Sequence, residues 1–371
     1  MAKQTGDASP GFRDVPKAAL VTGSGGFVGR RLVEMLVERG AERVVAFDLN
    51  PPADDALQHP AVTYVQGDIT DKAAVLAACK GMDCCFHLAA LVGPYHEENA
   101  YERVNYGGTL HVLDGCREHG VGKLVMSSSP STRFPYPDPN VRGLTEDDLA
   151  KINGGTYSPQ FHASYARTKA MGEKAVLEAC SDTLLTIAVA PHQVYGPRDP
   201  LLMPSILEAA RGGKLRVFGD GTNRVSFTHV DNYCHGLILG AEALYPGSKA
   251  LARFYIVTDD DSQLLWDAFD QAIVGVGIRS IKTRAAVPTA LILGVARLTM
   301  VLGRAIAFGS GRPYPHVMRR LKLDTFAVRM LVIDRWFDIS RAKKDLLYEP
   351  LLSFEDGWAD MTAWFAAREP S

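Results

Sequence analysis

The feature that most constrains this chain is a glycine-rich turn, TGSGGFVG, directly after an apolar run at 18–22. The residues at 27–39 carry apolar side chains at helical spacing, so the glycines stand where a strand passes into a helix. Gly23, Gly26 and Gly29 there permit a tight turn, let a diphosphate approach the backbone, and let helix and strand pack closely. Free N–H groups at the start of the helix favour an anion. The sequence therefore predicts a dinucleotide-binding turn of the Rossmann type.

Strand-like and helix-like segments alternate along the first 190 residues. The strands are apolar and rich in β-branched residues, which is typical of a parallel sheet covered on both faces. Ligands of such sheets bind beyond the carboxyl ends of the strands. The expected strands are 18–22, 43–48, 62–66, 84–88, 123–128 and 185–190, and the expected helices include 27–39, 71–80, 101–119 and 164–180.

The chain changes character after about residue 195, where loops, Pro and Gly become more frequent. We therefore expect an α/β fold in which a Rossmann-type, doubly wound parallel sheet spans 17–195. A smaller C-terminal substrate-binding cap covers most of 196–371, with returns to the sheet near 225–257. Residues 1–16 lack the apolar core of a secretory signal, so we expect a flexible tail there and a catalytic body on the cytosolic side of any membrane.

Charge and cysteine content argue against two classes of function. The 40 basic and 42 acidic residues give a net charge of −2, which provides no general attraction to nucleic acid. The six cysteines form no CxxC pair and no Cys/His cluster with zinc-site spacing. We expect reduced thiols in the core, no metal site and no nucleic-acid partner.

An acidic residue marks the expected nucleotide pocket. Asp48 lies 19 residues beyond the last glycine of the turn and ends the second strand. A carboxylate there binds the adenine ribose diol and repels a 2′-phosphate, so NAD is favoured over NADP. A guanidinium of Arg30 or Arg31 could instead bind that phosphate. Asp68 follows the third strand and is placed either to reach the adenine or to cap the helix at 71–80.

Tyr165 and Lys169 form a Tyr-x-x-x-Lys pair on one face of a helix. A phenol has a pKa of about 10 in water, and a neighbouring ammonium together with a cationic nicotinamide ring favours the phenolate. Tyr165 is therefore a candidate general base near neutral pH, and Lys169 is also placed to hold the nicotinamide ribose. Ser129, at the serine-rich end of a strand, is a candidate for orienting the substrate oxygen, although a serine there also serves as a turn or cap residue.

These motifs, in this order, resemble the extended short-chain dehydrogenase/reductase family over nearly the whole chain. The glycine turn is similar to TGxxGFxG in that family, and HLAA at 87–90 is similar to HxAA. VNYGGT at 104–109 is similar to VNxxGT, and PHQVYGPRD at 191–199 is similar to the segment that lines the nicotinamide.

The resemblance implies that Ser129, Tyr165 and Lys169 form the catalytic trio. It also implies a homodimer through the helix that carries Tyr165 and the helix at 101–119. The residues expected to contact NAD are Gly23, Gly26, Phe27, Val28, Gly29, Asp48, Asp68, Ile69, Leu88, Ala89, Ala90, Asn105, Ser127, Tyr165, Lys169, Pro191, His192 and Val194.

Three further stretches, 191–204, 216–232 and 339–357, resemble the 3β-hydroxysteroid dehydrogenase branch. Within that branch they are most similar to the group of decarboxylating sterol-4α-carboxylate 3-dehydrogenases. The last two stretches are shared more loosely with nucleotide-sugar epimerases. Relatives often carry Arg before the Pro-His pair, where this chain has Ala190, so a polar anchor near the nicotinamide is expected to be missing.

The segment at 271–323 contains nine Lys and Arg residues but no Asp or Glu. Within it, 287–308 is apolar and helical in pattern, yet Arg297 and Arg304 interrupt it, which disfavours a membrane-spanning helix. Its apolar residues line another face, as in an amphipathic helix that lies in a membrane interface beside anionic headgroups. The alternatives are a buried cap helix over an apolar pocket and a cluster of cations that binds a substrate diphosphate. We expect a peripheral position on the cytosolic side of the endoplasmic reticulum membrane, or otherwise a cytoplasmic one.

The leading hypothesis is NAD-dependent oxidation of the 3β-hydroxyl of a sterol-like substrate, with Tyr165 taking the hydroxyl proton. The resemblance implies a 4-carboxysterol, whose β-keto acid product loses CO₂. A nucleotide-sugar epimerase or dehydratase that retains NAD is a second enzymatic hypothesis. A non-catalytic NAD-binding regulator is a hypothesis of another class, against which the intact Ser129, Tyr165 and Lys169 argue.

Overall fold

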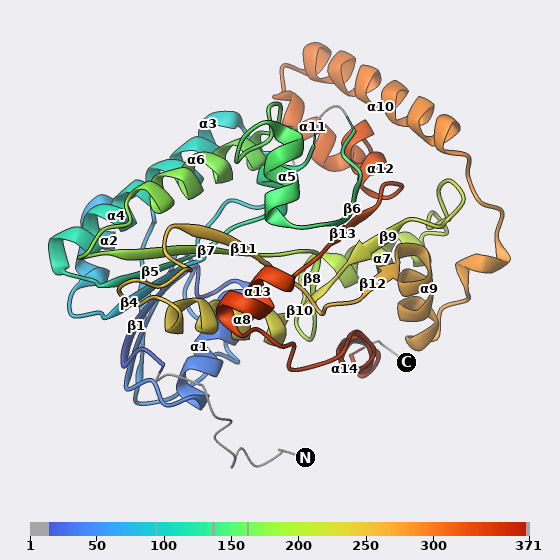
Figure 1. Cartoon of the computed structure of the whole chain (residues 1–371). Helices are drawn as coiled ribbons and strands as arrows, with labels where there is room; N and C mark the ends of the chain where they lie inside the picture. Colours follow the sequence, from blue (N-terminus) through green and yellow to red (C-terminus); the bar gives the residue numbers. More distant parts are fainter. Residues whose placement is uncertain (1–14, 94, 136–137, 162, 369–371) are drawn as a thin grey trace.

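The computed structural model describes residues 15–93, 95–135, 138–161 and 163–368 (Figure 1). Its centre is a seven-stranded sheet with the order β11-β7-β5-β4-β1-β2-β3, in which every neighbouring pair is parallel. The predicted doubly wound α/β fold is therefore confirmed, whereas most of the predicted flexible tail lies outside the described residues. The strands of the sheet are β1 (Ala18–Thr22), β2 (Arg43–Asp48), β3 (Val62–Gln66), β4 (Cys84–His87), β5 (Lys123–Ser127), β7 (Leu185–Pro191) and β11 (Arg253–Val257).

Helices cover both faces of this sheet (Figure 1). Neighbouring residues of β1 show the two sides: Leu20 packs with one group of helices and Val21 with the other, and both side chains are fully buried. This explains why the strands are continuously apolar rather than alternating. One face is covered by α2 (Lys72–Cys79), α4 (Gly108–His119) and α6 (Ser164–Glu178), and the other by α1 (Phe27–Glu38), α8 (Val230–Glu242) and α13 (Ser340–Leu346).

The cap is built around a second sheet with the order β12-β9-β13-β6. Its strands come from four distant parts of the chain: β6 (Val141–Leu144), β9 (Arg224–Ser226), β12 (Ser262–Leu264) and β13 (Arg335–Phe337). A short parallel pair, β8 (Val194–Tyr195) and β10 (Thr228–His229), lies between the two sheets. The remaining helical elements are α3 (Glu98–Tyr101), η1 (Glu102–Gly107), η2 (Pro130–Arg133), α5 (Glu146–Asn153), α7 (Leu202–Arg211), α9 (Leu265–Gly275), η3 (Ile281–Thr283), α10 (Thr289–Ser310), α11 (Tyr314–Leu321), α12 (Thr325–Met330) and α14 (Phe354–Ala366).

An aromatic cluster fixes the cap to the sheet. The ring of Tyr195 lies 5.0 Å from Trp358 and 6.0 Å from Phe227, centroid to centroid. All three side chains are almost completely buried, and the Tyr195 hydroxyl donates a 2.7 Å hydrogen bond to Asp259. Large aromatic side chains bury the most apolar surface per residue, so this cluster is a major source of stability at the junction.

The helix α10 lies along the outer side of α11 and α12, far from the central sheet (Figure 1). Only Ala296 and Gly303 of its residues are buried, whereas Leu298 and Val301 are each 58% exposed. Within the described chain it is the one helix long and apolar enough to cross a membrane, with a mean hydropathy of 1.8. The apolar face predicted from the sequence therefore faces outward, and the narrow face with small residues packs on the cap.

Candidate active site

The glycine turn is formed by backbone that has no room for side chains. Gly23 has a φ of +75°, and a Cβ there would lie 2.7 Å from the Ala89 nitrogen. A Cβ on Gly29 would lie only 2.1 Å from the Gly23 carbonyl oxygen, and one on Gly26 would lie 3.3 Å from it. The helix α1 begins directly after the turn, so its first N–H groups lack helical acceptors. The turn therefore fits a diphosphate held by backbone groups alone.

Side chains next to the turn face the core. Phe27 and Val28 are partly buried and pack against the buried cluster under α1. On β4, His87 is 1% exposed, and its two ring nitrogens hydrogen-bond to Thr22 (2.8 Å) and Thr109 (2.9 Å). This histidine joins β1, β4 and α4, and so it fixes the loop that begins with Leu88, Ala89 and Ala90 against the turn.

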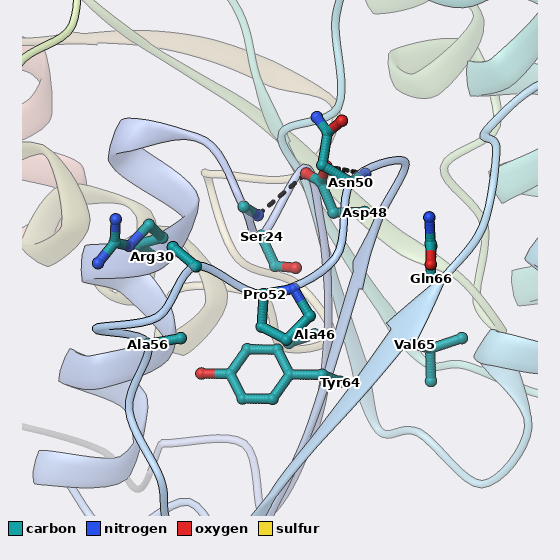
Figure 2. Close-up of a pocket in the computed structure, with 12 residues that line it drawn as sticks. Ser24, Arg30, Ala46, Asp48, Asn50, Pro52, Ala56, Tyr64, Val65 and Gln66 are labelled. Carbon is teal, nitrogen blue, oxygen red and sulfur yellow. Dashed lines mark hydrogen bonds between the residues drawn. The ribbon is translucent and has the colours of Figure 1, made fainter.

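Asp48 lies at the end of β2, in a pocket beside the turn (Figure 2). Its carboxylate accepts 2.9 Å hydrogen bonds from the backbone N–H groups of Gly25 and Asn50. Arg30 lines the same pocket and forms a 2.6 Å ion pair with Asp55. The geometry fits a ribose diol at Asp48, with one guanidinium nearby.

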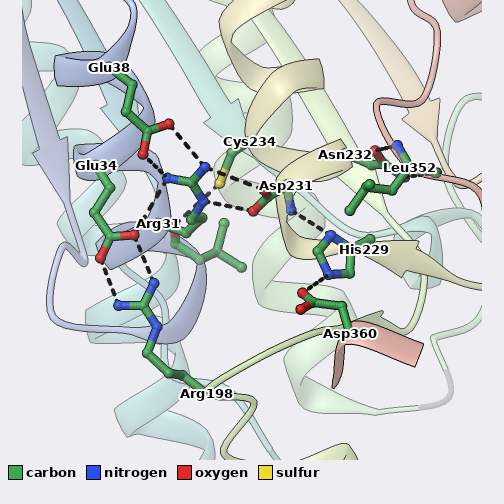
Figure 3. A network of polar contacts seen from close by, with 11 residues as sticks. Arg31, Glu34, Glu38, Arg198, His229, Asp231, Asn232, Cys234, Leu352 and Asp360 are labelled. Atoms are coloured by element: carbon green, nitrogen blue, oxygen red, sulfur yellow. Dashed lines mark hydrogen bonds and ion pairs between the residues drawn. The ribbon is translucent and has the colours of Figure 1, made fainter. Parts of the chain in front are cut away.

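Arg31 does not line this pocket and belongs to a separate network of ion pairs (Figure 3). Its guanidinium forms ion pairs with Asp231 at 2.7 Å and Glu38 at 2.8 Å. Arg198, which belongs to the PHQVYGPRD motif, binds Glu34 of α1 at 2.7 Å in the same network. Of the two arginines considered as ligands for a 2′-phosphate, only Arg30 therefore lies at the nucleotide pocket.

The structure excludes one of the two interpretations of Asp68. The cap of α2 is Asp71, whose side chain accepts hydrogen bonds from Ala73 and Ala74, so the assignment of this role to Asp68 was wrong. Asp68 instead accepts a 2.8 Å hydrogen bond from the Thr70 nitrogen in a local turn. The adjacent Ile69 is 7% exposed and packs against Gly108 at the start of α4.

The catalytic candidates on α6 lie against the end of β5. Lys169 is 3% exposed, and its ammonium donates a 2.7 Å hydrogen bond to the Ser127 carbonyl. The Ser127 hydroxyl accepts a 2.7 Å hydrogen bond from Tyr233 of α8. The Tyr165 ring contacts Tyr101 edge-on at 6.5 Å, and its phenol is among the groups that raise the pKa of Tyr233.

Burial shifts the pKa values of the Tyr-x-x-x-Lys pair in opposite directions. It raises the pKa of Tyr165 to about 12, with a further contribution from Tyr101. It lowers the pKa of Lys169 to about 8, against the opposing effect of the Glu173 carboxylate. From the sequence, the ammonium was expected to lower the pKa of the phenol. In the chain alone, burial has the largest effect on the pKa of Tyr165. The Lys169 ammonium donates its hydrogen bond to the Ser127 carbonyl instead of to the phenol.

The three consecutive serines have three different partners. Ser129 lies half-buried before η2, where its hydroxyl accepts a hydrogen bond from the Ser131 nitrogen and lies 2.9 Å from the Ser131 hydroxyl. Ser128 is buried and donates to Glu173. The cap function considered for Ser129 is therefore real, and it holds the hydroxyl at the carboxyl end of β5.

Two other predicted NAD-contacting residues tie elements together. Asn105, fully buried in the π-helical η1, accepts a 2.7 Å hydrogen bond from Leu91 and donates to Thr168 of α6. His192 follows β7 and Pro191, but its ring points to the cap, where Nδ1 lies 2.8 Å from the Ser226 carbonyl. Val194 lies in β8, partly buried against the main core.

Sequence reasoning missed several residues of this region. Glu173 is fully buried and forms an ion pair with Arg133, whose guanidinium lies 3.4 Å from the centroid of Phe254. Its position four residues after Lys169 could have indicated a common helix face. Tyr233 and Arg335 gave no signal, because their partners lie far away in the sequence. No cluster of metal-ligating side chains occurs within the described residues.

Comparison with known proteins identifies the family. The model of the 3-beta hydroxysteroid dehydrogenase/isomerase family matches residues 20–283. A 2-alkyl-3-oxoalkanoate reductase of Stenotrophomonas maltophilia is 34% identical over 94% of this chain and 99% of that protein. The decarboxylating sterol-4-alpha-carboxylate 3-dehydrogenase of Homo sapiens is 33% identical over 92% of this chain and 86% of that protein.

A solved structure shows the same fold. MoeE5 in complex with UDP-glucuronic acid and NAD matches with a TM-score of 0.68 and 23% identity, covering 95% of this chain and 100% of that one. The family model covers the glycine turn and the Tyr-x-x-x-Lys helix, and both relatives match more than nine-tenths of this chain. The chain therefore belongs to the 3-beta hydroxysteroid dehydrogenase/isomerase family, a branch of the extended short-chain dehydrogenases/reductases.

Proposed function

We propose that this protein is an NAD-dependent oxidoreductase that oxidises the secondary alcohol of a 3-hydroxy carboxylic acid with a large apolar body, such as a 4-carboxysterol. The observation that supports the proposal is the 2.7 Å hydrogen bond from the Lys169 ammonium to the Ser127 carbonyl, because it brings the helix of the Tyr165–Lys169 pair to the carboxyl end of β5, where Ser129 follows. Only β4 separates β5 from β1, the strand that leads into the glycine turn. In parallel sheets this edge is where ligands bind.

The names of two relatives narrow the substrate class. A sterol 4α-carboxylate that is oxidised at C3 has its carboxylate on the carbon next to the alcohol. A 2-alkyl-3-oxoalkanoate likewise has its carboxylate on the carbon next to the ketone, and that carbon carries an alkyl group. Both are branched 3-oxygenated acids at different oxidation levels. Both relatives' substrates share a carboxylate on the carbon next to the alcohol or ketone. We therefore define the substrate class of this chain by that group rather than by the sterol skeleton.

Asp48 supports NAD as the cofactor, because its carboxylate is held by two backbone N–H groups where a 2′-phosphate would have to lie. When bound, NAD supplies the acceptor for the hydride that leaves the alcohol carbon. Lys169 is positioned by Ser127 to hold the nicotinamide ribose.

The chain's own residues move the proton. The Tyr165 oxygen takes the proton of the substrate hydroxyl as the carbonyl forms, and the Ser129 hydroxyl donates a hydrogen bond to that oxygen. In the product, the carboxylate is β to the new ketone. Cleavage of the bond between C2 and the carboxylate releases CO₂ and leaves an enolate, whose oxygen faces the same Ser129 and protonated Tyr165 before C2 takes a proton from solvent.

We also propose that α10 binds the surface of a membrane on its cytosolic side, where an apolar substrate dissolves. The support is the outward apolar face of α10 together with the acid-free, basic segment around it. The homodimer through α4 and α6 stays a prediction of the family resemblance.

The test is a panel of matched substrates. Purified full-length protein with NAD is given a 3β-hydroxysterol with and without a 4-carboxylate, and a 2-alkyl-3-hydroxyalkanoate with its carboxylate-free alcohol. NADH absorbance and CO₂ release are followed. We expect NADH from the acids, and CO₂ in the same amount wherever the ketoacid decarboxylates. Tightly retained NAD with turnover of nucleotide sugars, or no turnover of any substrate, would overturn the proposal.

A further inference from the structure

Arg335 is a buried cation without a carboxylate partner. It begins β13 and is 5% exposed, and it forms no ion pair with any acid among the described residues. Burial alone lowers the pKa of its guanidinium to about 10, since no neighbouring acid raises it. The other deeply buried arginine, Arg133, is by contrast paired with Glu173. Burial of an unpaired charge lowers the stability of a folded protein. A functional role for Arg335 would explain why the charge is kept.

The hydrogen bonds of Arg335 leave part of its guanidinium unused. Nη2 donates 2.6 Å to the Met330 carbonyl, and Nη1 lies 3.3 Å from Nε2 of His192. Because Nδ1 of His192 faces the Ser226 carbonyl, that nitrogen carries the proton and Nε2 accepts from Arg335. Nε of Arg335 is buried and has no partner. Three of the five N–H groups thus remain, enough for a two-point contact with a carboxylate.

Arg335 lies at the seam between the cap and the active-site edge of the main sheet. His192, which it contacts, comes directly after β7, and β7 is the neighbour of β5 with its three serines. The rings of Phe337 and Phe134 lie 5.2 and 6.5 Å from the His192 ring. Phe134 follows η2, which Ser129 caps. Contacts therefore join Arg335 to His192 and His192 to Phe134, which ends the short η2 segment that Ser129 begins.

We infer that Arg335 binds the carboxylate of the substrate and so selects 3-hydroxy acids over simple alcohols. This inference rests on the proposed function. The carboxylate would provide the missing counter-charge, and its position on the carbon next to the alcohol would place that alcohol toward Ser129 and Tyr165. Arg335 is 5% exposed, so binding of the acid requires a local rearrangement around its guanidinium.

The contact between Arg335 and the substrate carboxylate disfavours loss of CO₂ until the carboxylate leaves the guanidinium. An arginine that holds a carboxylate stabilises its negative charge, whereas decarboxylation moves that charge to the ketone oxygen. We therefore expect the contact with Arg335 to favour oxidation and to disfavour loss of CO₂ while the carboxylate is bound.

The test compares acids with their carboxylate-free alcohols in three variants. Arg335→Gln removes the charge, and Arg335→Lys keeps the charge but not the fork. Arg142→Gln is the matched control, because Arg142 is an exposed arginine on the neighbouring strand β6, paired with Asp334. We expect Arg335→Gln to lower kcat/KM for the acid by about 10- to 100-fold, mainly through KM, with an intermediate loss for Arg335→Lys. The same variants should change kcat/KM for the alcohol by less than about 3-fold, and Arg142→Gln should leave both near wild type.

The outcomes separate the two proposals. Equal losses on acid and alcohol would mean a purely structural arginine and would overturn the inference while leaving the proposed function intact. An unchanged KM for the acid would do the same. Failure of the wild type to oxidise any 3-hydroxy acid would overturn the proposed function itself. If Arg335→Gln is unstable, binding of a non-reactive 3-oxo acid analogue to Arg335→Lys, followed by thermal shift, gives the same comparison.

Discussion

Tyr165 and Lys169 lie one helical turn apart, yet burial favours the neutral form of each. The pKa of Tyr165 rises to about 12 and that of Lys169 falls to about 8. A protonated phenol is the form that donates a proton to a ketone during a reduction. Oxidation needs the phenolate instead, and a cationic nicotinamide ring beside the phenol is the charge that favours it. The same tyrosine can therefore serve either direction.

Replacement of Tyr165 tests this role. We expect Tyr165→Phe to lower kcat by about 10²- to 10⁴-fold, because it removes the proton-transfer oxygen and keeps the ring. NAD binding, measured by fluorescence quenching or calorimetry, should stay near wild type. Tyr101→Phe is the control: its ring packs on Tyr165, but its hydroxyl bonds to the Gly93 carbonyl, so turnover should be kept. Wild-type turnover in Tyr165→Phe would remove this residue from the mechanism.

Short-range patterns predicted some site residues better than others. The glycine turn, Asp48 and the Tyr-x-x-x-Lys pair depend on neighbours in the sequence, and the structure places them at one edge of the sheet. The direction of the His192 ring depends instead on the Ser226 carbonyl, 34 residues away. Arg335 depends on His192 across 143 residues. Such partners follow from the packing of the cap, which no local pattern encodes.

At the level of elements, the six strands predicted with bounds in the first 190 residues agree with the structure to within a residue, whereas one of the four helices predicted with bounds does not. The strands of the second sheet, β6, β9, β12 and β13, were not predicted. The predicted helix at 101–119 is divided into α3, the π-helical η1 and α4. A Cβ on Gly108 would lie 2.8 Å from Ile69, so the chain has to approach α2 closely at this point. The wider turn of η1 also directs Asn105 toward α6. Single-turn π segments often occur at functional sites, and propensity gives no warning of them.

The proposal that α10 binds a membrane surface can be tested with lipid vesicles. We expect the protein to co-sediment with vesicles that contain phosphatidylserine, less with pure phosphatidylcholine, and less again at high salt. Leu298→Asp with Val301→Asp should abolish binding, because both side chains are 58% exposed on the apolar face. Activity on a water-soluble substrate should remain.

The control for α10 is Leu351→Asp, which adds a charge at an exposed leucine outside the 271–323 segment. It should bind vesicles as the wild type does. Equal binding by the double variant would exclude α10 as the contact. Resistance of the bound protein to high salt and carbonate would instead favour an inserted helix over a peripheral one.

At the scale of the whole molecule, three buried histidines link stability to pH. Burial lowers the pKa of His87, His192 and His235 to about 3, so all three are neutral in the folded chain. An unfolded histidine has a pKa of about 6.5, so between pH 6.5 and 3 the unfolded chain binds more protons. Their contribution is complete above pH 6.5 and is lost as the pH falls.

Urea unfolding at pH 7.5, 6 and 5 measures this linkage. We expect the free energy of unfolding to fall toward pH 5, by up to about 1.4 kcal/mol per pH unit for each histidine. His87→Gln, which retains hydrogen-bonding groups toward Thr22 and Thr109, should be less stable at neutral pH but less sensitive to acid. A pH-independent midpoint, or an unchanged slope in the variant, would contradict the assignment.

The second sheet combines strands from both halves of the chain, so the cap cannot fold from the C-terminal half alone. Strand β6 belongs to the first half of the chain, and within the described residues it pairs only with β13, which is synthesised nearly two hundred residues later. During translation the backbone N–H and C=O groups of β6 therefore stay unpaired until β13 is made. Unpaired strand edges of this kind promote aggregation. A ribosome that stalls before β13 would release a chain with an unpaired strand as well as an unfinished enzyme, and such a product is a natural target for chaperones and proteases.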